Sequence, residues 1–145
     1  MRSIQWMRGL LCFLISASVC APLAAQTTWP NRAIKLVVPF PPGGGTDLVA
    51  RSIAARLSDA LGQPVVAENR PGAGGTIGAD AVAKSTPDGY TIGIATSSTH
   101  PAAIVLQKNV PYDPVKSFAP ISLVGSTSYV LVATPTLAAN NINEL

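Results

Sequence analysis

The run Lys35-Leu-Val-Val-Pro-Phe-Pro-Pro-Gly-Gly-Gly-Thr-Asp47 decides how this chain folds. The segment Ile34–Val38 is mostly β-branched and aliphatic, and this composition predicts a buried strand. Three prolines then end the strand, and three glycines leave the backbone free to turn and bare of β-carbons. Thr46 and Asp47 can each cap or charge the start of a helix. The run therefore predicts a strand–loop–helix corner whose backbone N–H groups can bind an anion or a polar small molecule.

The residues that follow alternate between helical and strand patterns. Residues 47–61 carry apolar side chains at helical spacing and stop at Gly62, a normal C-terminal glycine. Strands are predicted over residues 64–69 and 90–95, and helices over residues 76–84 and 101–107. Short links between such elements imply parallel strands and right-handed crossovers. We therefore predict an α/β domain with a parallel-sheet βαβαβ core, with ligands bound outside the carboxyl ends of the strands.

The last part of the sequence continues this pattern without completing it. Residues 118–124 and 129–133 predict two more strands, separated by a short Gly-Ser-Thr-Ser link. Asn141 and Glu144 have the spacing of a capping box, which predicts the first turn of a helix. A domain seldom ends by starting a helix, so we expect a truncated chain whose remainder is C-terminal.

Three unusual loops fall at the carboxyl edge of the predicted sheet. The first is the opening run, the second is residues 70–78, and the third is the polar run 96–100. Together they predict a neutral site of backbone N–H groups, which suits a carboxylate because charge-assisted hydrogen bonds are the stronger ones. The alternative for each glycine-rich loop is that its glycines serve only tight turns. The candidate ligand-binding residues are Phe40, Pro41, Gly43, Gly44, Gly45, Thr46, Asp47, Gly72, Ala73, Gly74, Gly75, Thr76, Ser97, Ser98 and Thr99.

Several of these candidates have a second interpretation. Asp47 is more often a helix-start charge than a ligand contact. Phe40 either lines the pocket or packs beneath it, and the hydroxyls of residues 96–99 either line a site or face solvent. His100 is the only histidine, with no cysteine or acidic cluster near it in sequence. Entry into the following helix is therefore favoured for His100 over metal binding or catalysis.

The loops do not fit the common nucleotide or hydrolase motifs. The first lacks the lysine of a P-loop and carries Asp47 where a phosphate would be repelled. The second misses the G-x-G-x-x-G spacing because position 77 is isoleucine. Ser97 has no G-x-S-x-G context. We therefore predict no catalytic residue, no metal site and no cofactor.

Residues 1–25 predict a secretory signal peptide. Two arginines precede an apolar core of about 11 residues, short of the roughly 18 that a membrane span needs. Cleavage is expected after Ala25, and a lipoprotein site at Cys20 is the alternative. Cleavage removes both cysteines and two of the ten basic residues, which leaves eight basic against seven acidic residues and a net charge of +1. Such a chain fits the periplasm and offers no basic patch for nucleic acid or a membrane surface.

The mature segment resembles the Bug family, the extracytoplasmic solute receptors of tripartite tricarboxylate transporters. The resemblance rests on Trp29-Pro-Asn-Arg-Ala-Ile-Lys-Leu-Val-Val-Pro-Phe-Pro-Pro-Gly-Gly, Glu68-Asn-Arg-Pro-Gly-Ala-Gly-Gly75, Pro87-Asp-Gly-Tyr90 and Pro111-Tyr-Asp-Pro114, in the family's order and approximate spacing. It implies a periplasmic binding protein type II-like fold. Residues 26–128 would form the first lobe, and residues 129–145 would begin the crossing to a second lobe that is mostly absent here.

The resemblance also implies a function. It points to a monomeric periplasmic receptor that captures a small carboxylate, such as an amino acid, a di- or tricarboxylate or an aromatic acid, for the permease subunits of a transporter. Residues 41–47 and 72–76 would grip the carboxylate through main-chain groups and bridging waters, with residues 96–100 as a further wall. The fragment is expected to lack full binding. Two alternatives remain: an exported α/β enzyme acting on a phosphate or acyl substrate, and a ligand-sensing module of a regulatory system.

Overall fold

A three-stranded parallel sheet organises the chain. The computed structural model describes residues 28–138 and 141–144, so the predicted signal peptide lies outside the described residues. Strand β1 (Ile34–Val38) lies between β2 (Val65–Asn69) and β3 (Thr91–Gly93), with Leu36 opposite Ala67 on one side and Ile92 on the other. The strand that opens the deciding run is thus the central strand, hydrogen-bonded to a neighbour along each edge.

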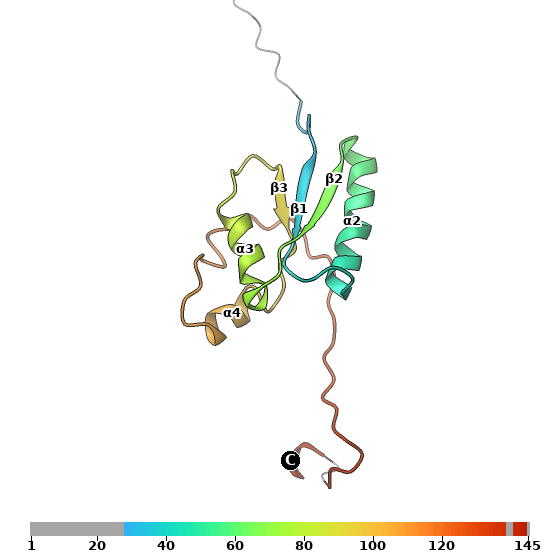
Figure 1. Ribbon diagram of the computed structural model, residues 1–145, viewed down its shortest axis with the longest axis vertical. Helices are drawn as coiled ribbons and strands as arrows, with labels where there is room; N and C mark the ends of the chain where they lie inside the picture. Colours follow the sequence, from blue (N-terminus) through green and yellow to red (C-terminus); the bar gives the residue numbers. More distant parts are fainter. Residues whose placement is uncertain (1–27, 139–140, 145) are drawn as a thin grey trace, which may run out of the picture.

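Helices cover both faces of this sheet. Helix α2 (Gly45–Leu61) lies on one side, and α3 (Thr76–Ala83) and α4 (Pro101–Leu106) lie on the other (Figure 1). The core between β1 and α2 is built from Ile34, Leu36, Val38, Ala50, Ala54 and Val65. Each large side chain buried in this way contributes about 1.5–3 kcal/mol relative to leaving it in water. Burial on both faces follows from the crossovers, because consecutive helices lie on opposite sides when the strand order is 2-1-3.

The predicted elements of the βαβαβ core are confirmed, with small shifts at their ends. Helix α2 begins at Gly45, two residues earlier than predicted, and ends at Leu61, followed by its C-cap Gly62, whose φ is +65°. Strand β3 is shorter than predicted, with three residues. Its neighbours still bond to β1, since Lys35 N–H donates to the Tyr90 carbonyl and Ile94 N–H donates to the Val37 carbonyl.

The two strands predicted over residues 118–124 and 129–133 are wrong for the described chain. Neither run forms a strand, and, Phe118 apart, their large apolar side chains are exposed, Leu131 by 74% and Tyr129 by 88%. A strand needs a partner for its backbone groups, and the sheet of the described residues contains only β2, β1 and β3. The apolar pattern alone therefore did not make these runs strands.

The predicted helix start at Asn141 is a single 3₁₀ turn, η3 (Ile142–Glu144). The Asn141 side chain accepts the Asn143 N–H at 3.0 Å and donates to the Glu144 carboxylate at 2.6 Å. The two predicted partners therefore meet through their side chains. No helix among residues 28–138 and 141–144 has the length and apolar content to cross a membrane.

Candidate functional site

The three predicted loops meet at the carboxyl edge of the sheet, with Gly75 at their junction. A β-carbon on Gly75 would lie 2.6 Å from Thr99 Cγ2 of the third loop and 3.3 Å from Pro39 Cβ of the first. The φ of Gly75 is +96°, so this position excludes a side chain on both steric and conformational grounds. The parallel sheet thus brings the loops together, as their positions after consecutive strands predict.

The first loop presents bare backbone at the start of a 17-residue helix. Gly43, Gly44 and Gly45 are exposed, and a β-carbon on Gly43 or Gly45 would meet nothing within 4 Å. Gly44 is the N-cap of α2, and no side chain of the described residues caps the helix there. The N–H groups of a first helical turn have no partner within the helix and carry its partial positive charge. This corner can therefore accept an anion.

Asp47 lies inside this corner, with 2% of its surface exposed. Its Oδ2 accepts the Gly43 N–H and the Arg51 Nε–H, each at 2.9 Å, and its Oδ1 accepts the Asn69 amide at 2.8 Å. The hydrogen bond from Arg51, followed by those from Gly43 and Asn69, holds the pKa of Asp47 well below its ordinary range. Both carboxylate oxygens are thus engaged within the chain. Of the two interpretations of Asp47, the helix-start charge fits this placement.

Asn69 and Arg51 were missed by the sequence reasoning. Asn69 ends β2, and its amide also donates to the Phe40 carbonyl at 3.0 Å, so it joins the first loop to the sheet. Arg51 spans from Asp47 to Asn69, since its Nη2 donates to Asn69 Oδ1 at 2.9 Å. The four-residue spacing of Asp47 and Arg51 on one helix was the available signal, because such pairs face each other. Phe40 is half-buried, and its carbonyl serves this network.

The second loop is a strained turn held from α4. Its residues Ala73–Gly75 form the 3₁₀ turn η2, and Ala73 has a φ of +49°, the one positive value of a non-glycine residue in the described chain. Such backbone strain often marks functional sites. Thr76 is buried, and its hydroxyl donates to the Ala73 carbonyl at 2.9 Å. Gln107, which follows α4, donates its amide to the same carbonyl at 2.9 Å. Thr76 thus shapes the turn, while Gly72, Ala73 and Gly74 are exposed.

The third loop contains both buried and exposed hydroxyls. Thr99 is 0% exposed, and its Oγ1 accepts the Thr96 N–H at 2.9 Å. The same Oγ1 lies 2.9 Å from His100 Nδ1. This contact is not an accessible nucleophile with its base, because the hydroxyl is buried and bonded inside the loop. Ser97 is exposed and Ser98 is half-buried. Of the predicted wall, Ser97 is therefore the hydroxyl open to a solute.

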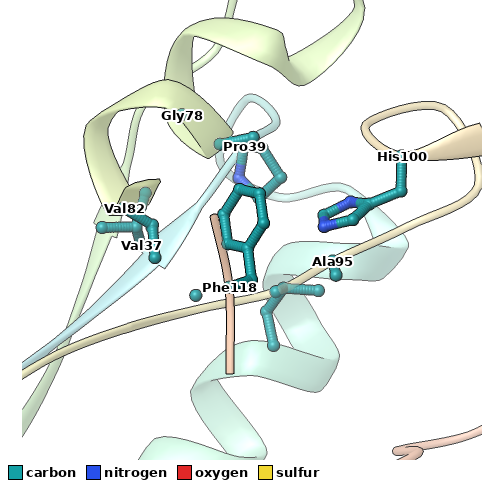
Figure 2. A pocket seen from close by; sticks show the side chains of 10 residues that line it. Val37, Pro39, Gly78, Val82, Ala95, His100 and Phe118 are labelled. Carbon is teal, nitrogen blue, oxygen red and sulfur yellow. The ribbon is translucent and has the colours of Figure 1, made fainter. Parts of the chain in front are cut away.

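Aromatic packing fixes the third loop on the side of α3. The rings of His100 and Phe118 lie 4.8 Å apart, and Tyr112 packs edge-on against Phe118 at 5.4 Å. Figure 2 shows the Phe118 ring between His100 on one side and Val37 and Val82 on the other. Burial lowers the pKa of His100, which favours the neutral imidazole. His100 immediately precedes α4, as predicted.

The cavity beside this aromatic cluster is small and apolar. Its volume is about 30 Å³, and its walls come from β1, α3, β3 and Phe118. An unpaired carboxylate would be costly in such a place. The candidate binding surface is therefore the open backbone of the first and second loops. Among residues 28–138 and 141–144, no group of three His, Cys, Asp or Glu side chains is placed to hold a metal ion.

Comparison with known proteins agrees with this arrangement. The family model described as "Tripartite tricarboxylate transporter family receptor" matches residues 49–145. Protein BugT of Bordetella pertussis is 47% identical over 135 residues, which cover 92% of this chain and 41% of that protein. This chain therefore spans about two fifths of the length of the curated relatives it matches.

Two solved structures from Rhodopseudomonas palustris contain a bound acid. MatC with bound malate is 46% identical with a TM-score of 0.64, over 66% of this chain and 33% of that one. Rpa4515 with adipate is 46% identical with a TM-score of 0.53, over 59% of this chain and 29% of that one. At 46% identity, each of these proteins resembles this chain in sequence as well as in fold.

Proposed function

This chain belongs to the tripartite tricarboxylate transporter receptor family, and from that premise we propose that it is the first part of an extracytoplasmic receptor for a small carboxylate. The observation that carries the proposal is the uncapped start of α2 at Gly44, which is open to solvent. A bound carboxylate would take the place of the missing cap. Malate and adipate, the acids in the two similar structures, are both dicarboxylates.

The strength of such a site follows from its donors. Each charge-assisted hydrogen bond contributes about 1.5–3 kcal/mol, and a helix N-terminus adds about 0.3–1 kcal/mol. Micromolar affinity corresponds to about 8 kcal/mol. Three or four contacts approach this value when water is excluded, which requires a second lobe to close over the corner.

The proposed domain organisation supplies that lobe. Residues 26–128 form the first lobe, and residues 129–145 begin the crossing to the second. The exposed apolar side chains of Val130 and Val132, at 79% and 82%, support this division. Exposed apolar side chains of this kind would be buried where further protein packs on this segment. The receptor would be exported by its signal peptide, act as a periplasmic monomer, and deliver the acid to permease subunits.

The alternatives have less support. The relatives are solute-binding receptors rather than enzymes, and the Thr99–His100 contact is buried. The test is isothermal titration of the full open reading frame that contains this chain. Malate, adipate, aspartate, citrate and benzoate represent the proposed ligand classes. Saturable heat without turnover is expected with at least one of them. Binding of none of the five acids, or catalytic consumption of one of them, would refute the proposal.

Gly44→Val tests the position of the site. A side chain here would block the approach of an acid to the backbone, and we expect binding to be abolished. The fold should persist, because the φ of Gly44 is −77° and its nearest contact, Pro41 O at 3.7 Å, is ordinary. Gly125→Val is the matched control, since Gly125 is also exposed and has nothing within 4 Å. Unimpaired binding by Gly44→Val would place the acid elsewhere.

A further inference from the structure

Two opposite charges lie one turn apart at the start of α2. The Asp47 side chain is 3% exposed, and the Arg51 side chain is 51% exposed. The Arg51 guanidinium bonds the Asp47 carboxylate through Nε and Asn69 through Nη2, each at 2.9 Å. The guanidinium therefore reaches from the helix to the end of β2 across the base of the first loop.

The Arg51 guanidinium offsets the negative charge of Asp47 at the start of α2. A buried carboxylate in the first turn of a helix occupies the positive end that an anionic ligand would use. It also repels a second carboxylate brought close to it. The cationic side chain that follows β2, Arg70, pairs instead with Glu68. Arg51 is thus the side chain in contact with Asp47 that can neutralise it.

Asp47 is held by one charged side chain, Arg51, and one neutral side chain, Asn69. Asn69 carries no charge, but its amide joins Asp47 Oδ1 to the Phe40 carbonyl and so fixes the path of the loop. Gly43 N–H contributes a further bond to Asp47 on the loop side. Removal of Asn69 should loosen the loop for every ligand. Removal of the charge on Arg51 should matter most for ligands that are anions.

We propose that Arg51 is a positioning residue that neutralises Asp47 and thereby lets this helix N-terminus accept a carboxylate. The inference rests on the proposed function, capture of a carboxylate at the same corner. It assigns the preference for an anion to a side chain that need not touch the ligand. The side-chain charges of Asp47 and Arg51 cancel before binding, which leaves the partial positive charge of the helix N-terminus available to the acid.

The test is a charge-rescue experiment in the full open reading frame, read by isothermal titration with the five acids named above. Arg51→Gln should weaken binding of the tightest-bound acid by about tenfold or more, because it leaves the Asp47 charge uncompensated. Asp47→Asn combined with Arg51→Gln removes both charges and should restore binding to within about threefold of wild type. Arg51→Lys keeps the charge and should retain most of the affinity.

The outcomes separate the possible roles. A merely structural Arg51 would leave the double variant as weak as Arg51→Gln or weaker, because the contacts of the network are still lost. That result, or wild-type affinity in Arg51→Gln, would overturn the inference while the proposed function stands. A wild-type protein that binds none of the five acids overturns the proposed function and this inference with it. Asn69→Ala is the shape control, expected to weaken binding without rescue by Asp47→Asn.

Discussion

Replacement of Gly75 by alanine tests whether the three loops are joined as described. Two costs are expected. The backbone at φ +96° disfavours any L-residue by about 1–2 kcal/mol. The new β-carbon, 2.6 Å from Thr99 Cγ2 and 3.3 Å from Pro39 Cβ, must also displace its neighbours, and overpacking of this kind costs about 1–3 kcal/mol. The sum, about 2–5 kcal/mol, is a large part of the 5–15 kcal/mol that stabilises a typical domain.

Two other glycines separate these costs. Gly62 has a φ of +65° with nothing within 4 Å, so Gly62→Ala bears the conformational cost alone. Gly44→Ala meets neither strain nor a close contact and should cost at most about 1 kcal/mol as a poorer N-cap. Urea unfolding followed by circular dichroism measures all three variants. Equal losses for Gly75→Ala and Gly62→Ala would refute the tight junction between the loops.

Two further predictions concern the network and the aromatic cluster. The pKa of Asp47 in the folded chain lies below its unfolded value of 3.8. The stability that ionised Asp47 contributes is therefore complete above pH 3.8 and is lost as the pH falls toward the folded pKa. Asp47→Asn should therefore lower the free energy of unfolding at pH 7 and reduce the loss of stability in acid, measured by urea unfolding from about pH 2 to 7. Asp59→Asn, at an exposed position, is the control. An unchanged dependence of stability on pH in Asp47→Asn would contradict the lowered pKa of Asp47. Phe118→Ala removes a half-buried ring and should cost about 1–3 kcal/mol. It should also raise the pKa of His100 toward its ordinary value by relieving burial, seen by NMR titration, and a constant pKa would mean that Phe118 does not shield the imidazole.

The core of the fold could be predicted because local sequence determines each of its elements. Ile34–Val38 is a strand by composition, the prolines and glycines after it end that strand, and Gly62 ends the helix that follows. The comparisons confirm the predicted family and fold class. The strands predicted over residues 118–124 and 129–133 were wrong because local sequence does not determine them. Strand formation depends on a partner strand, and the described sheet provides none for them.

The loops could be found from the sequence, but the residues that shape them could not. Asn69 contacts Asp47 across 22 positions and Phe40 across 29, and no local pattern relates these residues. The buried positions of Thr76 and Thr99 are equally non-local, because Gln107 and Tyr112 reach them from beyond the next helix. Two of the fifteen predicted site residues thus support the loops through hydroxyls that face inward. Whether the exposed ones touch a ligand stays a prediction.

The placement of Asp47 changes the argument that excluded phosphate. The sequence suggested that Asp47 would repel a phosphate from the first loop, yet its charge is engaged by Arg51 and by the Gly43 N–H. A neutralised carboxylate repels a phosphate no more than it repels the proposed ligand. What remains against phosphate is the missing lysine of a P-loop, since a doubly charged group gains most from a cation that contacts it. A corner with backbone donors and a balanced pair of charges suits one carboxylate group of an acid, which carries a single charge, better than it suits a phosphate. Inorganic phosphate should therefore fail to displace a bound acid, and competition by phosphate in the same titration would show that the corner selects charge alone.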